Sequence, residues 1–346
     1  MSTSGRSPLA TPDVVRAKAP LRISFAGGGT DVMPYPVDHG GCVLSATIDM
    51  YAFAHLVPRD DDEVTVATDD PHHLPEVPED RMFDGHTHLV QACLRRMAPS
   101  RGLDLVLASD APPGTGLGSS SALVVAMLTA LGELEGRAPT PYELAAEAYT
   151  VERYDLGQSG GMQDQYAAVF GGFNFIEFHD EDRVVVHPLR IRSDLRNELH
   201  ASLVLCNTGR RRKSGGILAR QVAGYVGGEA PTVTALAGIK ELALEMKEAL
   251  LVGDLQRFAK GLDEGWRAKR ELAEGITTPE LDALYEVAVA NGALGGKVLG
   301  AGGGGYLLLM CDPTRRAELG SAMTAAGAPV TRFTFTEDGA QVWRAR

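Results

Sequence analysis

The 346-residue sequence predicts an α+β fold with two domains. Its length exceeds what one small hydrophobic core usually holds. Strand-like and helix-like segments follow one another without the regular alternation that builds a parallel sheet. The first half is rich in strand patterns, whereas the second half is rich in helical ones. We therefore expect a division near residue 190, with one domain at residues 14–190 and another at residues 191–346.

The first half carries strong strand and helix signals. Residues 119–135 are apolar on most helical faces, which predicts a buried helix. Thr140 precedes Pro141, and Glu143 follows three residues later, which is the pattern of a capped helix start. The remaining expected segments are strands at 14–26, 41–57, 63–67 and 103–108, a loop at 69–84, a helix at 88–97, and a hairpin formed by 173–178 and 183–189.

The second half combines longer helical patterns with a few short apolar strands. Residues 300–305 form a glycine-rich loop that leads directly into an apolar segment. The expected strands are 203–207, 306–311 and 330–335, and the expected helices are 233–247, 254–274, 279–291 and 314–326.

Composition narrows the class of protein. Hydrophobic residues make up 44% and charged residues 23%, as in soluble globular proteins. No apolar run reaches the roughly 18 residues of a membrane span, and residues 1–12 lack the apolar core of an export signal. The four cysteines are far apart in the sequence, which favours a reducing, cytoplasmic location. The net charge of −12 argues against nucleic acid or an anionic membrane as a partner.

A glycine-rich loop at residues 112–122 predicts a site for the phosphates of ATP. Its alternating glycines let backbone N–H groups converge, and the helix that follows points its positive end into the loop. Serine hydroxyls at the helix start can bind phosphate oxygens or Mg²⁺. The residues expected to bind ATP are Pro113, Gly114, Thr115, Gly116, Leu117, Gly118, Ser119, Ser120 and Ser121.

Two common nucleotide-binding motifs do not match this loop. A Walker A loop requires a lysine after its last glycine, and none follows Gly118. A dinucleotide-binding motif requires a third glycine where this sequence has Ser119, which argues against an oxidoreductase.

The string P-P-G-T-G-L-G-S-S-S-A resembles the ATP-phosphate loop of the GHMP kinase family. Residues 19–31 resemble the first motif of that family, and residues 296–306 resemble its third. The resemblance runs from about residue 16 to the end of the chain. It implies a two-domain GHMP kinase fold, with an N-terminal half like domain 2 of ribosomal protein S5 and a ferredoxin-like C-terminal half. It also implies ATP and Mg²⁺ as cofactors.

The resemblance assigns catalytic roles to four residues. Ser120 and Glu152 match the positions that bind Mg²⁺, although a glutamate here could also be a solvated helix charge. Asp164 lies in the segment G-G-M-Q-D-Q-Y, where the family places the general base, although a loop aspartate can also form a turn. Arg22 matches the basic residue of the first motif, which would hold the transferring phosphoryl group.

Within the family, the string A-G-G-G-T-D resembles the heptose 7-phosphate kinases more than the galactokinases. This branch implies phosphorylation of the anomeric C1 hydroxyl in nucleotide-activated heptose synthesis. Four consecutive cations at residues 210–213 could bind the phosphate of the acceptor, or could form a solvated basic loop. The residues expected to bind the acceptor are Gly28, Gly29, Thr30, Asp31, His39, Gly161, Asp164, Arg210, Lys213, Gly303 and Gly304.

Other functions fit parts of the same pattern. A kinase for a free sugar such as fucose, or for a mevalonate-like alcohol, would carry the same three motifs. A catalytically inactive sugar or nucleotide sensor could share the fold, but such a protein could lose Ser120, Glu152 or Asp164, and all three are present. The sequence is also compatible with a homodimer.

Overall fold

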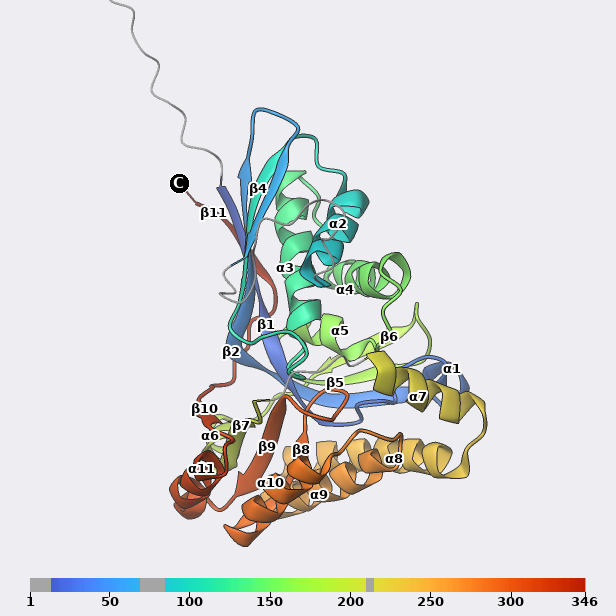
Figure 1. The fold of residues 1–346 in the computed structure, drawn as a ribbon, viewed down its shortest axis with the longest axis vertical. Coiled ribbons are helices and arrows are strands. Elements are labelled where there is room, and N and C mark those ends of the chain that lie inside the picture. The colour runs from blue at the N-terminus through green and yellow to red at the C-terminus, as the bar shows by residue number, and fades with distance from the viewer. Residues whose placement is uncertain (1–13, 69–84, 210–214, 346) are drawn as a thin grey trace, which may run out of the picture.

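The computed structural model describes residues 14–68, 85–209 and 215–345, and its elements form two sheets with helices packed against them (Figure 1). The larger sheet has seven strands and carries the long pair β1 and β2 at its centre. Its core order is β11-β1-β2-β4-β3, and the hairpin β5–β6 joins through β2. The strands are β1 (Val14–Ala26), β2 (Gly41–Pro58), β3 (Val64–Thr68), β4 (Leu103–Ser109), β5 (Phe173–Phe178), β6 (Val184–Pro188) and β11 (Gln341–Ala345).

The smaller sheet has four strands in the order β10-β7-β9-β8. Every residue of β9 is buried, as expected for a strand with a neighbour on each side. Figure 1 shows this sheet below the larger one, with α8 and α9 beside it. The strands are β7 (Leu203–Asn207), β8 (Ala293–Val298), β9 (Tyr306–Cys311) and β10 (Val330–Thr331).

Helix α3 packs on the larger sheet, and twelve of its residues are buried. It packs against β1 and β2, which explains why its sequence is apolar on most faces. The α-helices of the described residues are α1 (Tyr35–His39), α2 (Gly85–Met97), α3 (Ser119–Leu134), α4 (Pro141–Thr150), α5 (Gln163–Phe170), α6 (Ser193–Ser202), α7 (Gly215–Val226), α8 (Ala230–Val252), α9 (Leu255–Arg270), α10 (Pro279–Ala290) and α11 (Arg316–Ala325). A π-helical segment spans Val151–Asp155, and a 3₁₀ turn spans Pro313–Arg315.

The helix start predicted at Thr140 is confirmed in detail. The Thr140 hydroxyl accepts the Glu143 backbone N–H, and the Glu143 carboxylate accepts the Thr140 backbone N–H. The capping box thereby satisfies two N–H groups at the helix start, and Pro141 stands at a position that needs no donor.

Several elements were not predicted. Helices α1, α5, α6 and α7, and strands β8 and β11, lie in segments to which the sequence analysis assigned no element. The strand expected at residues 330–335 is wrong in extent, because β10 covers only Val330–Thr331. Phe335 leaves that strand and forms an isolated bridge to Ile48 of β2, and the chain then continues into β11. The loop expected at residues 69–84 lies outside the described residues.

Strand β11 pairs with a strand, β1, that lies at the other end of the sequence. It pairs antiparallel with β1, from Val14 opposite Ala345 to Lys18 opposite Gln341. The C-terminal segment thus returns to the larger sheet. The division into domains at residues 14–190 and 191–346 stays a prediction. Within the described ranges, no helix is long and apolar enough to cross a membrane.

Candidate active site

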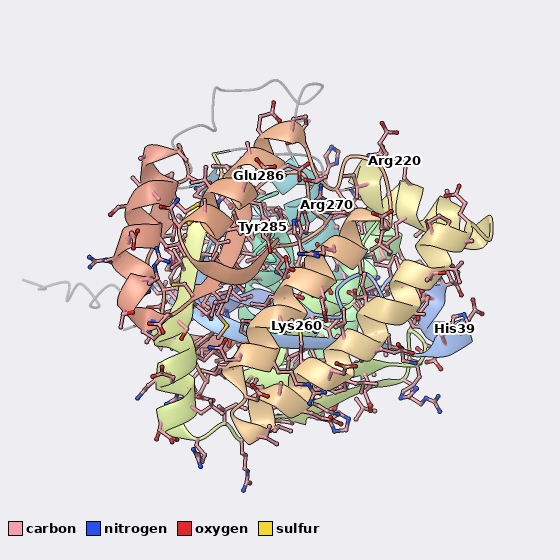
Figure 2. All side chains as sticks on the ribbon, turned by 90° about the horizontal axis from the view of Figure 1, so that it is seen from below. His39, Arg220, Lys260, Arg270, Tyr285 and Glu286 are labelled. Carbon is pink, nitrogen blue, oxygen red and sulfur yellow. The ribbon has the colours of Figure 1, made fainter. Side chains whose placement is uncertain are left out.

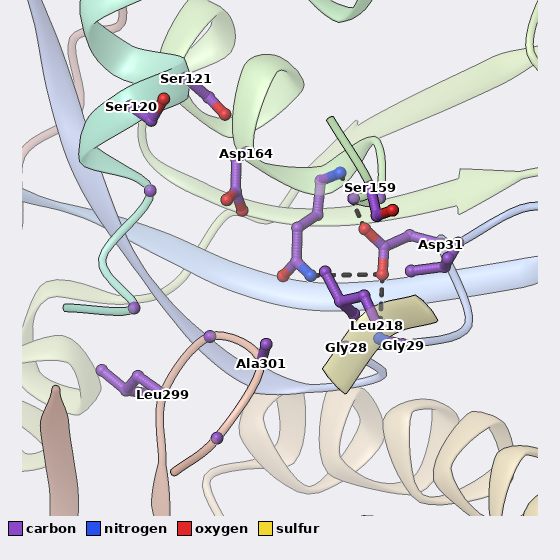
Figure 3. Close-up of a pocket in the computed structure, with 18 of the residues that line it drawn as sticks. Gly28, Gly29, Asp31, Ser120, Ser121, Ser159, Asp164, Leu218, Leu299 and Ala301 are labelled. Carbon is purple, nitrogen blue, oxygen red and sulfur yellow. Dashed lines mark hydrogen bonds between the residues drawn. The ribbon is translucent and has the colours of Figure 1, made fainter. Parts of the chain in front are cut away.

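A cavity of about 160 Å³ lies where three glycine-rich loops meet. The first loop follows β1, the second precedes α3, and the third connects β8 to β9. Figure 3 shows Asp164 between Ser120 and Asp31, with Ala301 of the third loop across from them. The cavity therefore gathers residues from β1 of the larger sheet, from the loop between β8 and β9 of the smaller sheet, and from segments more than a hundred positions apart.

The second glycine loop has the backbone of an anion cradle. Gly114, Gly116 and Gly118 all have positive φ angles, between 76° and 86°. Gly118 is the N-cap of α3 and supplies no capping side chain, so the first N–H groups of the helix remain available to a ligand. A Cβ atom on Gly116 would lie 2.5 Å from the Leu299 carbonyl oxygen, so this loop tolerates no side chain there.

Arg22 joins this loop to Asp164. The guanidinium is only 3% exposed and donates through Nε (2.8 Å) and Nη2 (2.5 Å) to the same carboxylate oxygen, Asp164 Oδ1. Its Nη1 donates to the Gly116 carbonyl oxygen at 2.6 Å. Asp164 Oδ2 receives no hydrogen bond from the described residues, and the side chain remains 25% exposed. One carboxylate oxygen is thus fixed by Arg22, whereas the other is left open to a ligand.

Glu152 forms the acidic end of the cradle. Its side chain is almost fully buried and accepts hydrogen bonds from Ser120 Oγ (3.3 Å), Ser121 Oγ (2.7 Å) and Gln165 Nε2. Glu152 lies in the π-helical segment, a local distortion that often marks functional sites. The distortion brings its carboxylate against the first turn of α3.

The Ser120 hydroxyl and the Glu152 carboxylate suit Mg²⁺. Both are hard oxygen donors at the helix end that can hold phosphates, and Mg²⁺ commonly takes one or two protein ligands together with phosphate oxygens. The two residues would hold the ion, which when bound would neutralise charge on the triphosphate.

Asp31 is fully buried beside the cavity. Its carboxylate accepts the Gly29 N–H at 2.9 Å, the Gln163 N–H at 3.0 Å and Gln163 Nε2 at 3.2 Å. Burial raises the pKa of Asp31 above its usual value, while the two backbone hydrogen bonds act in the opposite direction. A Cβ atom on Gly161 would lie 1.9 Å from Asp31 Oδ2, so glycine at 161 is what lets the two segments meet.

The third glycine loop touches the second one directly. A Cβ atom on Gly300 would lie 2.5 Å from the Gly116 Cα atom, and one on Gly305 would lie 2.2 Å from the Thr115 carbonyl oxygen. The Gly303 N–H donates to the Ile276 carbonyl oxygen at 2.6 Å, which holds the loop against the segment between α9 and α10. The two loops therefore close one end of the cavity.

Most predicted site residues lie in the cavity wall, and some do not. Five predicted residues belong to the glycine-rich loops but do not line the cavity; they are Thr30, Pro113, Thr115, Leu117 and Gly303. The Thr30 hydroxyl donates to the Gly27 carbonyl oxygen, and the Thr115 hydroxyl donates to the Pro112 carbonyl oxygen. Predicted residues that line the cavity are Arg22, Gly28, Gly29, Asp31, Gly114, Gly116, Gly118, Ser119, Ser120, Ser121, Glu152, Gly161, Asp164 and Gly304.

His39 and the basic segment do not take part in the described cavity. His39 ends α1, is exposed, and packs its ring against Tyr35 and Tyr225. Figure 2 labels it at the outer edge of the molecule. Arg210 and Lys213 lie outside the described residues.

Sequence reasoning missed several residues of the cavity wall. Gln163 lies beside Asp164, and Arg153 lies beside Glu152, so both were adjacent to predicted positions. Gln221 comes from α7 and donates to the Gly29 carbonyl oxygen at 3.0 Å. Lys269 comes from α9 and donates to the Gly300 carbonyl oxygen. No local sequence signal marks Gln221 or Lys269, because only the fold brings their helices to the cavity.

This arrangement defines a small-molecule kinase. The glycine cradle suits a triphosphate, and the open oxygen of Asp164 lies beside it, with Gly118 close enough that an added Cβ would approach the Asp164 carboxyl carbon to 3.4 Å. Comparison with known families agrees: the GHMP kinases N terminal domain matches residues 87–172, and the GHMP kinases C terminal domain matches residues 246–329.

The chain belongs to the GHMP kinase family. It is 38% identical over 338 residues to D-glycero-alpha-D-manno-heptose 7-phosphate kinase of Campylobacter jejuni, covering 95% of this chain and 99% of that protein. The crystal structure of a D-glycero-D-manno-heptose 1-phosphate kinase from Bacteroides thetaiotaomicron superposes with a TM-score of 0.78 at 34% identity, covering 96% and 99% of the two chains. Galactokinase of Lactococcus lactis shares the fold, with a TM-score of 0.74 at 20% identity over 95% of each chain. GHMP sugar kinases use ATP, typically with Mg²⁺.

Proposed function

We propose that this kinase transfers the γ-phosphoryl group of Mg-ATP to the anomeric C1 hydroxyl of D-glycero-D-manno-heptose 7-phosphate. The product would be the 1,7-bisphosphate, in the biosynthesis of nucleotide-activated heptose. The similarity to the heptose 7-phosphate kinase over nearly the whole chain supports this acceptor. The structural observation that carries the chemistry is the one-sided pairing of Arg22 with Asp164, which leaves Oδ2 open toward the cavity.

In this mechanism Asp164 is the general base. Its Oδ2 would accept the proton of the C1 hydroxyl while the hydroxyl oxygen bonds to the γ-phosphorus atom and the bond to the β–γ bridging oxygen breaks. Arg22 fixes the carboxylate by two hydrogen bonds and fixes the cradle by its bond to Gly116, so it couples the position of the base to that of the phosphate. Backbone N–H groups of the second glycine loop would hold the triphosphate.

Asp31 supports the acceptor side of the site. Because its oxygens already accept three hydrogen bonds from protein N–H groups, it shapes the first glycine loop and fixes Gln163. Gly28, Gly29 and Gly161 would then present backbone to the sugar at positions where a side chain would intrude.

An ADP-release assay with Mg-ATP tests the acceptor. The panel contains D-glycero-D-manno-heptose 7-phosphate, the corresponding 1-phosphate, the free heptose, fucose, galactose and mevalonate. We expect turnover with the 7-phosphate, and a new anomeric phosphate in the ³¹P NMR spectrum of the product. Turnover restricted to the 1-phosphate, to a free sugar or to mevalonate would reject the proposed acceptor and keep the kinase class. No turnover with any member, while ATP still binds, would favour a sensor.

The phosphate of the acceptor needs cations of its own, and Arg210 and Lys213 remain our prediction for them. Replacing both by alanine should raise KM for heptose 7-phosphate at least about tenfold, because each charge-assisted hydrogen bond contributes roughly 1.5–3 kcal/mol. KM for ATP should not change. The matched control replaces the exposed cations Arg101 and Lys260 by alanine. An unchanged KM for the acceptor in the first variant would assign residues 210–213 to a solvated loop.

A further inference from the structure

Arg153 is a largely buried cation in the wall of the cavity. It follows Glu152 in the π-helical segment, and its side chain is only 13% exposed. Its Nη1 donates to the Gln158 carbonyl oxygen at 3.3 Å, and its Nη2 donates to the Gly161 carbonyl oxygen at 3.2 Å. The planar guanidinium thus fastens both ends of residues 158–161, all of which line the cavity.

Residues 158–161, which we call the acceptor segment, lie at the end of the cavity that holds Asp31. Figure 3 shows Ser159 at this end, with Ser120 and Ser121 at the opposite end. The segment packs against Asp31 through Gly161 and then leads into α5, whose first turn carries Asp164. Its position therefore affects both the surface offered to an acceptor and the start of the helix that holds the base.

The same guanidinium lies beside the carboxylate that would hold Mg²⁺. Arg153 Nη2 is 3.9 Å from Glu152 Oε2, and the Glu152 side chain is only 3% exposed. A carboxylate buried to this extent needs positive charge nearby, and Arg153 is its ion-pair partner among the described residues. Because the distance is longer than a hydrogen bond, Arg153 acts on Glu152 through its charge and leaves the carboxylate oxygens to other partners.

Packing alone does not account for arginine at this position. The Arg153 Nε is buried and has no hydrogen-bond partner among the described residues, which costs stability. A Cβ atom on Gly160 would lie 2.3 Å from the guanidinium carbon, so the acceptor segment can cross the guanidinium only because residue 160 has no side chain. Local costs of this kind are typical of functional sites, where a required geometry outweighs them.

We propose that Arg153 is a positioning residue that couples the Mg²⁺ carboxylate of Glu152 to the acceptor segment. Phosphoryl transfer requires the acceptor hydroxyl to lie in line with the γ-phosphorus atom, so the two ends of the cavity must keep a fixed separation. Arg153 provides this link because it holds the acceptor segment by two hydrogen bonds and faces Glu152 with its charge. It forms and breaks no bond in the reaction. The proposal rests on the proposed function, in which Glu152 holds Mg²⁺ and the acceptor binds beside Asp31.

Two substitutions separate the hydrogen bonds of Arg153 from its charge. Arg153→Lys keeps the charge but lacks the planar fork that reaches both carbonyl oxygens, whereas Arg153→Gln removes the charge as well. In both variants we expect KM for the acceptor to rise about tenfold, with a smaller fall in kcat and little change in KM for ATP, because charge-assisted hydrogen bonds to the acceptor segment are lost. Arg192→Lys and Arg192→Gln are the matched controls, because Arg192 also pairs with a carboxylate but is 78% exposed.

Two measurements test the coupling without turnover. Hydrogen exchange of the backbone amides in peptides that cover residues 153–166 should become about tenfold faster in both variants, since the acceptor segment loses its anchors. Calorimetric titration of the ADP-bound enzyme with Mg²⁺ should give a Kd that is lower by about threefold in Arg153→Gln and unchanged in Arg153→Lys, because only glutamine removes a positive charge beside Glu152. A residue that only stabilised the fold would weaken Mg²⁺ binding when it is replaced, so the two roles predict opposite directions.

Two results would overturn the proposal. The first is an Arg153→Lys variant with the acceptor KM and the exchange rates of wild type. The second is a Mg²⁺ Kd in Arg153→Gln that equals or exceeds that of wild type, while Glu152→Gln weakens Mg²⁺ binding. If Glu152→Gln itself leaves Mg²⁺ binding unchanged, the metal site of the proposed function fails and the coupling fails with it. If the acceptor is a different sugar, KM is measured with that sugar, and the exchange and Mg²⁺ results still decide the role of Arg153.

Discussion

Replacing Asp164 by asparagine separates the chemistry of this side chain from its packing. Asparagine is isosteric, and its Oδ1 can still accept the two N–H bonds of Arg22, now at 2.8 and 2.5 Å. The open position at Oδ2 becomes an NH₂ group, which donates and cannot take the acceptor proton. We expect kcat to fall about 100- to 10,000-fold, the usual contribution of a general base, which corresponds to about 2.7–5.5 kcal/mol.

The same substitution has a structural cost that can be bounded. Arg22 is 3% exposed and would lose its carboxylate partner, but it keeps the Gly116 carbonyl oxygen and the amide oxygen. Because Asp164 is itself 25% exposed, we expect a loss of about 1–3 kcal/mol in the free energy of unfolding, below the range for breaking a fully buried pair. Urea unfolding measures this term independently of turnover.

The assay follows ADP release at saturating Mg-ATP, with Asp60→Asn as the control because Asp60 is exposed and far along the chain from the site. The Kd of Mg-ATP should stay within about threefold of wild type, since the positive charge of Arg22 remains beside the cradle. An Asp164→Asn variant with near-normal kcat would refute the assignment of Asp164 as base. A loss of ATP binding equal to the loss of turnover would point to damage in the cradle instead.

Further substitutions address other parts of the site. Glu152→Gln should raise the Mg²⁺ concentration for half-maximal activity about tenfold, and an unchanged Mg²⁺ curve would count against ligation. Gly116→Val should abolish ADP binding measured by calorimetry, because its Cβ would lie 2.5 Å from the Leu299 carbonyl oxygen; retained affinity would mean that the cradle is misassigned. Because the pKa of Lys297 is lowered in the folded protein, the unfolded chain holds the lysine proton more tightly. The free energy of unfolding should therefore increase as pH rises toward 10.5. Lys297→Met should lose this gain in urea unfolding as pH rises toward 10.5, and an unchanged pH dependence would reject the assignment.

The elements of this fold that the sequence predicts are those whose signals lie in a few neighbouring residues. The capping box at Thr140 and Glu143 needs only four residues to be recognised, and the burial of α3 follows from its apolar faces. Helix α5 was missed because it is only eight residues long and no side chain caps its start. Strand β11 was missed because it depends on β1, more than three hundred positions away, for its pairing.

The same distinction explains which site residues the sequence predicts. Ser120 and Asp164 lie within motifs whose glycines are visible in the sequence, so their roles could be inferred before the structure. Lys269 lies in a helix with Arg267 and Arg270 nearby, a pattern typical of a solvated face. Its burial arises only when α9 packs beside β8 and brings the end of the helix to Gly300. A residue that links a helix to a loop distant in the sequence has no local signature, because its contacts form only when the two segments pack together. The cavity therefore depends on α9 as well as on the glycine cradle, and loosening α9 should lower turnover even where the three motifs are intact.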